Sequence, residues 1–322
     1  MDKENEKIIQ TFQKLLGENA SKDEKNLQCE DSRGNIVHAF IKSMSIFIEQ
    51  SQETTFQGLY LAMKNASRQI SKKLKEDRKL INGRSTLTLK AVSEIMLNLI
   101  NKHISTKLNE DFGLLKKKLV SISNDFYLMS LFAKEKISKS FMQTIRNRMT
   151  ILVHGFSSTV LHALLFAYNK GLNFKVYVTE CRPDNTGEKL ALKLKEFGIS
   201  HELILDNSVG FIMGSIDCVV FGADAVVENG GIINKIGTFT IAICAKFFKK
   251  QVYVLVESLK FLRMFPLDQN DIPQQNLNDV NKFFDNSLSD YTSPDFITLL
   301  FTDLGIFTPS AVSDELIQMF NN

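Results

Sequence analysis

Polar and charged residues follow several short apolar segments in the second half of the chain, and these residues could do chemistry. His154 follows TILV, Arg182 follows VYVT, and Asp224 follows CVVF, with Asn234 and Lys235 shortly after it. An imidazole, a carboxylate and cationic groups suit acid–base chemistry or the binding of an anion such as a phosphate. From spacing alone, a set of turns and caps that serves only the fold is an equally good interpretation.

The elements that must position these residues alternate in character. Short β-branched runs at 150–153, 176–179, 202–205, 218–221 and 252–256 predict strands. Helix-period stretches at 157–168, 187–197 and 237–248 lie between them. Apolar strands alternating with helices indicate a doubly wound, mostly parallel, Rossmann-like α/β sheet domain. Because the carboxyl ends of parallel strands meet at one edge, the polar residues above are expected to share a pocket there.

The first half of the chain reads as helices. Apolar residues fall at helical spacing at Phe40, Ile41, Met44, Phe47 and Ile48, and the segments 56–70, 87–104 and 111–133 are similar. Before position 183 the chain has no proline to break them. We therefore predict an α-helical regulatory domain over 1–139 and the α/β domain over 140–322. The polar segment 268–293 is expected to be a long loop or a partly ordered excursion, and the apolar tail 294–320 to pack on the sheet.

Composition excludes several classes of protein. The formal charge of +3 over 322 residues does not indicate a nucleic-acid partner. The four cysteines lack metal-ligand spacing, and no apolar run reaches the roughly 20 residues of a membrane span. Dinucleotide-binding, P-loop and zinc-protease motifs are missing. We expect a cytosolic protein without metal, cofactor, membrane or direct nucleic-acid binding; the start of the chain, MDKENEKIIQ, has no apolar core of a secretory signal.

Four segments resemble a known superfamily: 176–191, 209–238, 254–267 and 290–316. It is shared by the alpha, beta and delta subunits of translation initiation factor 2B and by isomerases of methylthioribose-1-phosphate or ribose-1,5-bisphosphate. VVENGGIINKIGT (226–238), LFTDLGIFTPSAVSDEL (300–316) and ETTFQGLYLAMKNA (53–66) resemble the alpha-subunit branch most. The resemblance is specific from about residue 150 onward and weaker over the first 130 residues.

The resemblance implies a pocket and raises the question of catalysis. The isomerases of this superfamily carry a cysteine directly after the histidine at the first strand exit, and Gly155 stands at that place. Asp224, Asn234 and Lys235 match the retained aspartate and ligand-binding pair. A vestigial sugar-phosphate-type pocket in a non-catalytic protein is therefore expected, formed by His154, Arg182, Asp224, Asn234 and Lys235. The alternatives are an isomerase using Asp224, with Cys181 as a possible substitute thiol, and a module that only binds a metabolite.

The resemblance also implies partners. It predicts a regulatory subunit that forms a homodimer, bridges the other subunits of the guanine-nucleotide exchange complex, and helps sense the phosphorylated alpha subunit of initiation factor 2 during stress. Exchange itself would occur on another subunit. A basic cluster that could dock a phosphorylated surface comprises Lys72, Lys73, Lys75, Arg78, Lys79 and Arg84, although a solvated helix face is the simpler interpretation. Phe261, Met264 and Phe265, with Leu262 and 299–301, are candidates for the dimer interface or for the core.

Overall fold

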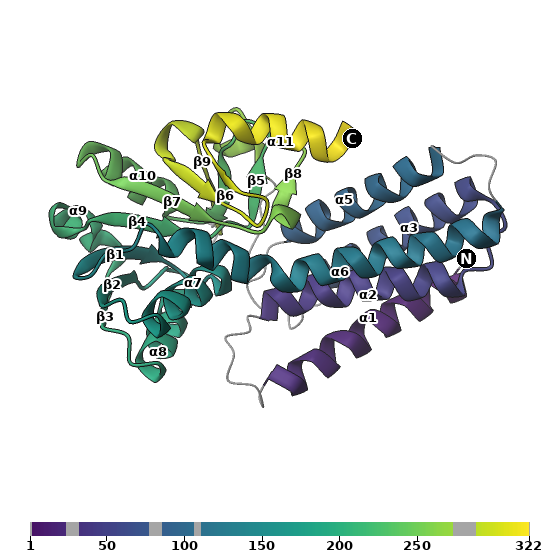
Figure 1. The fold of residues 1–322 in the computed structure, drawn as a ribbon, viewed down its shortest axis with the longest axis horizontal. Coiled ribbons are helices and arrows are strands. Elements are labelled where there is room, and N and C mark those ends of the chain that lie inside the picture. Colours follow the sequence, from purple (N-terminus) through teal and green to yellow (C-terminus); the bar gives the residue numbers. More distant parts are fainter. Residues whose placement is uncertain (1, 24–31, 77–85, 106–110, 273–287, 322) are drawn as a thin grey trace. The chain divides into compact units, whose positions relative to one another are not determined.

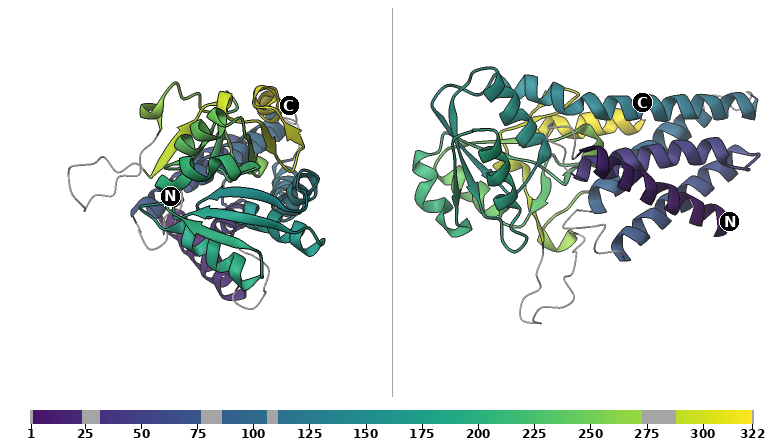
Figure 2. Two further views of the ribbon diagram at one scale, coloured as in Figure 1. Left: turned by 90° about the vertical axis from the view of Figure 1, so that its left-hand side faces the viewer. Right: turned by 90° about the horizontal axis from the view of Figure 1, so that it is seen from below.

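The computed structural model describes residues 2–23, 32–76, 86–105, 111–272 and 288–321. The chain forms two compact units (Figures 1 and 2). Unit 1 comprises Met1–Phe132 with Met319–Asn322, and unit 2 comprises Ala133–Gln318. Colour follows the sequence in both figures, so unit 1 is mostly purple and blue and unit 2 runs from teal to yellow.

Unit 1 is helical, as predicted. Its helices are α1 (Asp2–Asp23), α2 (Ser32–Gln50), α3 (Phe56–Glu76), α5 (Thr86–Ser105) and most of α6 (Phe112–Met142). Phe40, Ile41, Met44 and Ile48 are at most 1% exposed, which confirms the apolar stripe of α2. The helix α6 runs through the domain boundary predicted at residue 139, so that boundary coincides with no break in secondary structure.

Unit 2 contains a seven-stranded sheet in the order β11-β10-β7-β4-β1-β2-β3. Its strands are β1 (Met149–His154), β2 (Phe174–Thr179), β3 (His201–Ile204), β4 (Cys218–Phe221), β7 (Gln251–Leu255), β10 (Leu299–Phe301) and β11 (Ile306–Phe307). All neighbours are parallel except β10 and β11. The five strands and the fold class predicted from the sequence are confirmed.

Helices cover both faces of this sheet. In Figure 1, α7 (Ser158–Asn169) and α8 (Thr186–Glu196) lie on one side, and α10 (Thr238–Phe247) and the short α9 (Val209–Ile212) lie on the other. The chain builds the sheet outward in one direction from β1 through β2 to β3, and in the other from β4 through β7 to β10, so the strand order reverses between β1 and β4. Doubly wound sheets bind ligands outside the carboxyl ends of the strands at such a reversal. This places the ends of β1 and β4, at His154 and Phe221, beside the expected site.

A second sheet, β8-β5-β6-β9, was not predicted. It consists of β5 (Ala225–Val227), β6 (Ile232–Lys235), β8 (Phe261–Leu262) and β9 (Ser289–Thr292). For the segment 268–293, the strand β9 at its end agrees with the expectation of a partly ordered excursion rather than a long loop. Strands of two to four residues are too short for a periodic pattern, and β9 pairs with β6, more than 50 residues earlier.

The remaining elements are the C-terminal helix and short connecting turns. The helix α11 (Pro309–Asn321) follows β11, and short 3-10 turns at 206–208, 213–215, 258–260, 269–271 and 294–296 connect the strands. Leu300 and Phe301 are 0% exposed, so the prediction that this tail packs on the sheet is confirmed for β10. Among the described residues, no helix has the length and apolar character needed to cross a membrane.

Candidate functional site

His154 ends β1 and is fully engaged in hydrogen bonds. Its Nε2 lies 2.8 Å from the carbonyl oxygen of Ile236, and its Nδ1 lies 2.6 Å from Oγ1 of Thr179. Since a carbonyl only accepts, Nε2 carries the proton and Nδ1 accepts from the Thr179 hydroxyl. Burial lowers the pKa of His154, so the ring is neutral. It joins two strands of the main sheet to the turn after β6.

The thiol of Cys181 lies next to this histidine. Its Sγ is 3.6 Å from Nε2 of His154, and a Cβ added at Gly155 would lie only 3.1 Å from the same sulfur. The Cys181 side chain therefore occupies room that a side chain at 155 would need. Burial, with the charge of Asp184, raises the pKa of Cys181 to about 12, so the group is a neutral thiol rather than a nucleophilic thiolate.

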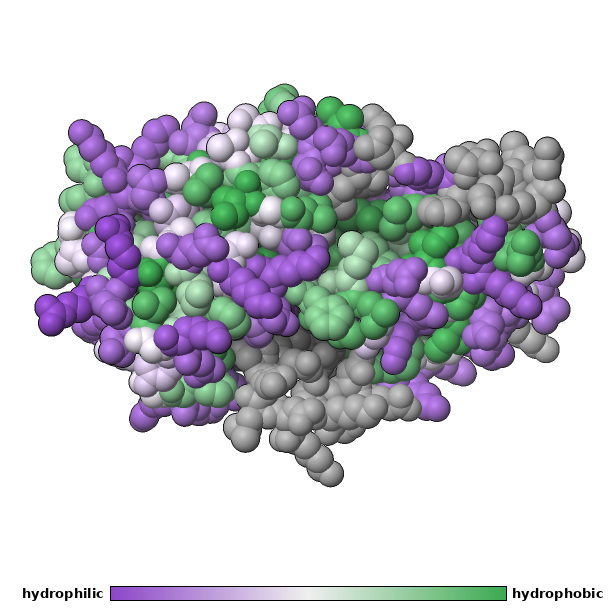
Figure 3. Space-filling view, viewed as in Figure 1, coloured by the Kyte–Doolittle hydropathy of each residue, from purple (hydrophilic) through white to green (hydrophobic). Residues whose placement is uncertain are grey.

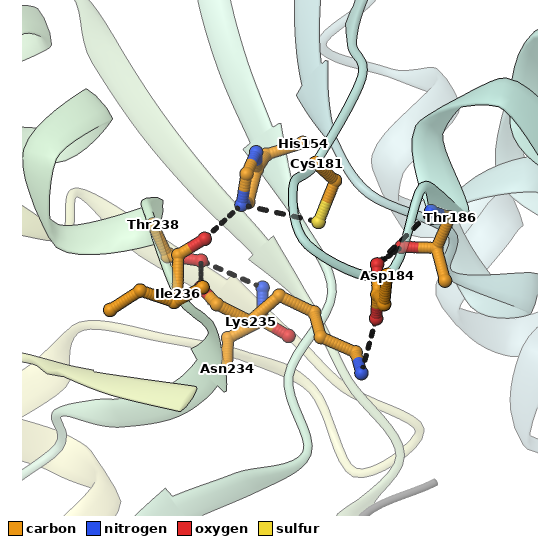
Figure 4. Close-up of polar contacts among 8 residues, drawn as sticks. All are labelled: His154, Cys181, Asp184, Thr186, Asn234, Lys235, Ile236 and Thr238. Carbon is orange, nitrogen blue, oxygen red and sulfur yellow. Dashed lines mark hydrogen bonds and ion pairs between the residues drawn. The ribbon is translucent and has the colours of Figure 1, made fainter. Parts of the chain in front are cut away.

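An ion pair closes one side of the site. Nζ of Lys235 lies 2.7 Å from Oδ2 of Asp184, and the side chains are 7% and 16% exposed. Figure 4 shows Lys235 extending from β6 toward Asp184, which in turn accepts from the backbone and hydroxyl of Thr186. Burial by itself would raise the pKa of Asp184, but the Lys235 ammonium and the Thr186 bonds hold it below its usual value. A phosphate bound to Lys235 would have to share it with Asp184.

Buried polar side chains lie across the second sheet. Asn234 on β6 pairs in register with Asp290 on β9, and the backbone amide of Asp224 donates to the Ile233 carbonyl beside them. Asp224, Asn234 and Asp290 are 2%, 5% and 5% exposed. Asn234 donates to Oγ1 of Thr238. Burial raises the pKa of Asp290 to about 7, although the amides of Phe239 and Gly237 donate to it.

The predicted site residues are partly brought together. His154, Asn234 and Lys235 lie around the turn that follows β6, and Asp224 is on the adjoining β5 side (Figure 4 shows the first three). Arg182 is 56% exposed and pairs with Glu180 and Glu188 instead. The sequence missed Asp290 and the Asp184–Lys235 pair as site components, because each depends on partners far away in the chain.

The other predicted contact residues fall in different settings. Lys72 is exposed and Lys73 half-buried on α3, whereas Arg78, Lys79 and Arg84 lie outside the described residues, as does the side chain of Lys75. Phe261 is 0% exposed, so for this residue the core alternative applies. Met264 is half-buried and Phe265 is 60% exposed.

Two further observations limit the chemistry. No group of three or more potential metal ligands occurs among the described residues. A cavity of about 210 Å³ lies in unit 1 between α1 and α2, lined by residues such as Lys7, Thr11 and Ser43, and none of the predicted site residues lines it. The arrangement around His154 suits the binding of an anionic ligand better than covalent catalysis, because the neighbouring thiol of Cys181 is buried and protonated.

Comparison with known proteins places this geometry in a family. The family described as "Initiation factor 2 subunit family" matches residues 30–309. The translation initiation factor eIF2B subunit alpha of Dictyostelium discoideum is 40% identical over 291 residues, covering 85% of this chain and 88% of that protein. The same subunit of Caenorhabditis elegans is 42% identical over 194 residues, 58% of this chain and 64% of that one.

More distant relatives include enzymes. The ribose 1,5-bisphosphate isomerase of Pyrococcus furiosus is 27% identical over 308 residues, 92% of this chain and 91% of the isomerase. Among solved structures, the Pyrococcus horikoshii translation initiation factor eIF-2B superposes with a TM-score of 0.69 at 22% identity, over 94% of this chain and 98% of that one. A chain of the eIF2B-beta2-delta2 complex of Chaetomium thermophilum gives 0.72 at 18%, over 97% and 94%. These two likenesses support the fold. The family match and the alpha-subunit relatives show that this chain belongs to the initiation factor 2 subunit family, as a translation initiation factor 2B subunit.

Proposed function

We propose that this chain is the regulatory alpha-type subunit of the factor 2B complex and has no catalytic activity of its own. One observation carries the proposal: the position after His154 is Gly155, and the nearest thiol, that of Cys181, is buried with its pKa raised to about 12. A site that keeps Asp224, Asn234 and Lys235 without an activated thiol retains binding groups and lacks a nucleophile. The 40% identity to an eIF2B alpha subunit supports the same conclusion.

The competing function is a sugar-phosphate isomerase that uses Asp224. The relatives named ribose 1,5-bisphosphate isomerase, and the burial of Asp224 at 2% exposure, are the observations in its favour. Purified protein incubated with aldose 1-phosphates and ribose 1,5-bisphosphate separates the two functions. We expect no turnover. Turnover that Asp224→Asn abolishes would overturn the regulatory proposal.

The retained pocket is proposed to bind a phosphorylated metabolite. Lys235 supplies a nearly buried ammonium group, and Asn234 lies beside it on β6. Thermal shift with a panel of sugar phosphates should raise the melting temperature of the wild type and leave Lys235→Met unchanged. The matched control is Lys175→Met, which removes an exposed lysine paired with Glu202 on the neighbouring strand. The absence of any shift at millimolar ligand would count against a working pocket.

The partners are proposed to be a second copy of this chain, the other factor 2B subunits and the phosphorylated alpha subunit of initiation factor 2, in the cytosol. Apolar side chains reach the surface along α6, where Leu128, Met129 and Phe132 are 50%, 52% and 57% exposed (Figure 3). On unit 2, Phe265 and Leu267 are 60% and 81% exposed. Such exposure is typical of chains that work inside an assembly. Tagged protein should therefore co-purify with the other subunits from its own cells.

The helical unit is proposed to help recognise the phosphorylated partner through Lys72 and Lys73. A pull-down should retain the phosphorylated alpha subunit of initiation factor 2 better than the unmodified one when the complex is assembled. The double change Lys72→Glu and Lys73→Glu should weaken that retention. The double change Lys90→Glu and Lys102→Glu, at two exposed positions of α5, is the control of equal charge change. Equal losses in both variants would refute a role for this part of α3.

A further inference from the structure

Asp290 makes contacts that lead directly to the candidate pocket. Its Oδ2 accepts hydrogen bonds from the backbone amides of Gly237 at 2.8 Å and Phe239 at 3.0 Å. These amides belong to the turn between β6 and α10, so a carboxylate on β9 fastens the start of that helix. The preceding residue in the same turn, Ile236, supplies the carbonyl that accepts from His154.

The turn and the imidazole are packed against each other. A Cβ added at Gly237 would lie 3.0 Å from Cε1 and 3.1 Å from Nε2 of His154. Gly237 has φ +103°, in the left-handed region, which leaves the backbone close to the ring. A shift of this turn would therefore displace the ring and lengthen its bond to Ile236. The orientation and tautomer of His154 depend on where the turn is held.

Burying the carboxyl group of Asp290 costs more free energy than capping a helix requires. A serine, threonine or asparagine satisfies the first amides of a helix without a buried charge. Here the carboxyl group is 5% exposed, and within the described part of the chain its Oδ1 is buried without a hydrogen-bond partner. Buried polar atoms without partners call for an explanation in function or strain. The contacts of Oδ2 provide a functional explanation for the burial of this carboxyl group, because they hold the turn that contacts His154.

We infer that Asp290 is a positioning residue for the pocket: it fastens the Ile236–Gly237 turn and thereby holds the imidazole of His154 as its Nε2–H tautomer between Ile236 and Thr179. Since Lys235 directly precedes Ile236, the same turn also sets the base of the lysine side chain that reaches Asp184. This inference deepens the proposed pocket, and it rests on that proposal only for its ligand measurement.

The first experiment uses the wild type without ligand. The protons on Gly237 N, Phe239 N and His154 Nε2 should exchange with solvent through one shared opening, with protection factors within about threefold of one another. Exchange of the two amides is followed by NMR, and the ring proton by long-range ¹⁵N correlation in histidine-labelled protein, assigned by substituting the other four histidines. A ring proton that stays protected at least tenfold longer than both amides would overturn the inference.

The second experiment compares variants of β9. Asp290→Ala should speed exchange of the His154 ring proton at least tenfold and shift its Nε2 resonance, while Asp290→Asn, which keeps an acceptor oxygen, should restore both. Thr292→Val is the matched control, because Thr292 lies two residues along the same strand, is 0% exposed, and has a buried hydroxyl without a partner among the described residues. An unchanged ring signal in Asp290→Ala, or an equal change in Thr292→Val, would overturn the inference. If Asp290→Ala does not fold, the wild-type exchange experiment decides.

The ligand measurement is kept separate. Titration with ribose 5-phosphate should show at least tenfold weaker binding to Asp290→Ala than to the wild type, and less than a twofold change for Thr292→Val. If the wild type does not bind at all, the pocket proposal fails, and the ring-proton readout still decides the role of Asp290. Equal affinity of the wild type and Asp290→Ala for ribose 5-phosphate would show that the turn does not affect ligand binding. It would overturn the inference that Asp290 positions the pocket for its ligand.

Discussion

At the scale of single residues, Gly155 is restricted both by its backbone and by its neighbours. Its φ is +65°, and an added Cβ would lie 3.1 Å from Sγ of Cys181 and 3.2 Å from Oγ1 of Thr186. We predict that Gly155→Ala lowers the free energy of unfolding by about 2–4 kcal/mol, from left-handed strain and crowding together. Urea unfolding measures this loss.

Two variants separate the contributions to that loss. Gly171 has φ +87° with nothing within 4 Å of an added Cβ, so Gly171→Ala should cost only the strain, about 1 kcal/mol. Cys181→Ala should recover part of the loss in the Gly155→Ala background, with a coupling of roughly 0.5–3 kcal/mol. Equal losses at 155 and 171 with zero coupling would contradict the steric account, and would mean that Cys181 does not occupy the room of a side chain at 155.

The carboxyl group of Asp290 gives a pH prediction. Its pKa is raised to about 7 in the folded state, so between its unfolded pKa, near 4, and pH 7 the folded protein holds a proton that the unfolded chain has released. Stability contributed by this group is complete below pH 4 and is lost as the pH rises toward 7, by an amount on the order of 4 kcal/mol. Asp290→Asn lacks this slope. His154, with its lowered pKa, contributes a slope of opposite sign in both proteins.

The measurement is therefore a difference. Urea unfolding of the wild type and of Asp290→Asn at pH 5 and pH 8 should show that the wild type loses stability relative to the variant at the higher pH. The same difference at both pH values would mean that Asp290 titrates normally and is not buried as the structure places it.

Individual site residues were predictable from the sequence only where they follow a predicted strand or match the family pattern. His154 ends β1, so the topology predicts its place at the carboxyl edge of the main sheet. Asn234 and Lys235 lie on β6 of the second sheet, and they were assigned to the pocket from their position after CVVF and from the family resemblance. Asp290 lies in the polar segment SDYT, and its partners Gly237 and Phe239 are 53 and 51 residues away. Arg182 was assigned to the pocket from its position after β2, but nearby carboxylates of Glu180 and Glu188 hold its guanidinium at the surface. The contacts of Asp290 join distant segments and are therefore absent from local spacing, whereas Glu180 lies only two residues from Arg182 and was a visible alternative partner.

At the scale of elements, Glu257 after β7 forms a buried ion pair with Lys260 and a hydrogen bond that joins this segment to α7. Glu257 accepts from Oγ1 of Thr159 at 2.7 Å and pairs with Nζ of Lys260 at 2.9 Å, with both charged side chains 12–13% exposed. Burial would raise the pKa of Glu257, but Lys260 and Lys134 lower it to about 2. Lys260→Met removes the closest countercharge and should lower the free energy of unfolding by about 3 kcal/mol at pH 7.

The control for this prediction is a surface pair. Lys175→Met breaks a pair with Glu202 whose side chains are 40% and 52% exposed, and it should cost less than about 1 kcal/mol. The double change Glu257→Gln and Lys260→Met should be less harmful than Lys260→Met alone, because it leaves no unpaired buried charge. Losses of equal size from Lys260→Met and Lys175→Met in chemical denaturation would refute the buried pair.

The helices and the strands of the main sheet were predicted well, including the four-residue β3 and β4, whereas the strands of the second sheet were not. The apolar runs of β1, β2, β4 and β7 are buried on both faces of a parallel sheet, so they read as continuous hydrophobic segments. The second sheet is built of strands of two to four residues. Its stability comes from pairing between distant segments, such as Val226 of β5 with Phe261 of β8, which no local pattern encodes.

At the scale of the whole molecule, the exposed apolar side chains predict how copies associate. Phe261, Met264 and Phe265 were proposed from the sequence for the dimer interface or the core. The structure buries Phe261 in the core and leaves Phe265 60% and Leu267 81% exposed, four and six residues further on. We predict that Phe265→Asp with Leu267→Asp converts a dimer to monomers in sedimentation velocity, because a charge placed in an apolar interface loses its hydration without gaining a partner.

The control for dimerisation is a second exposed aromatic residue. Phe211, on α9 and 94% exposed, carries no such assignment, so Phe211→Asp should leave the sedimentation coefficient unchanged. The circular dichroism spectrum of both variants should match the wild type, since the changed side chains lie at the surface. If the dimer persists in the Phe265→Asp, Leu267→Asp variant and dissociates in Phe211→Asp, the dimer interface lies on the α9 side of unit 2 instead. A wild type that sediments as a monomer at micromolar concentration would instead remove the homodimer from the proposed function and leave the other subunits as its partners.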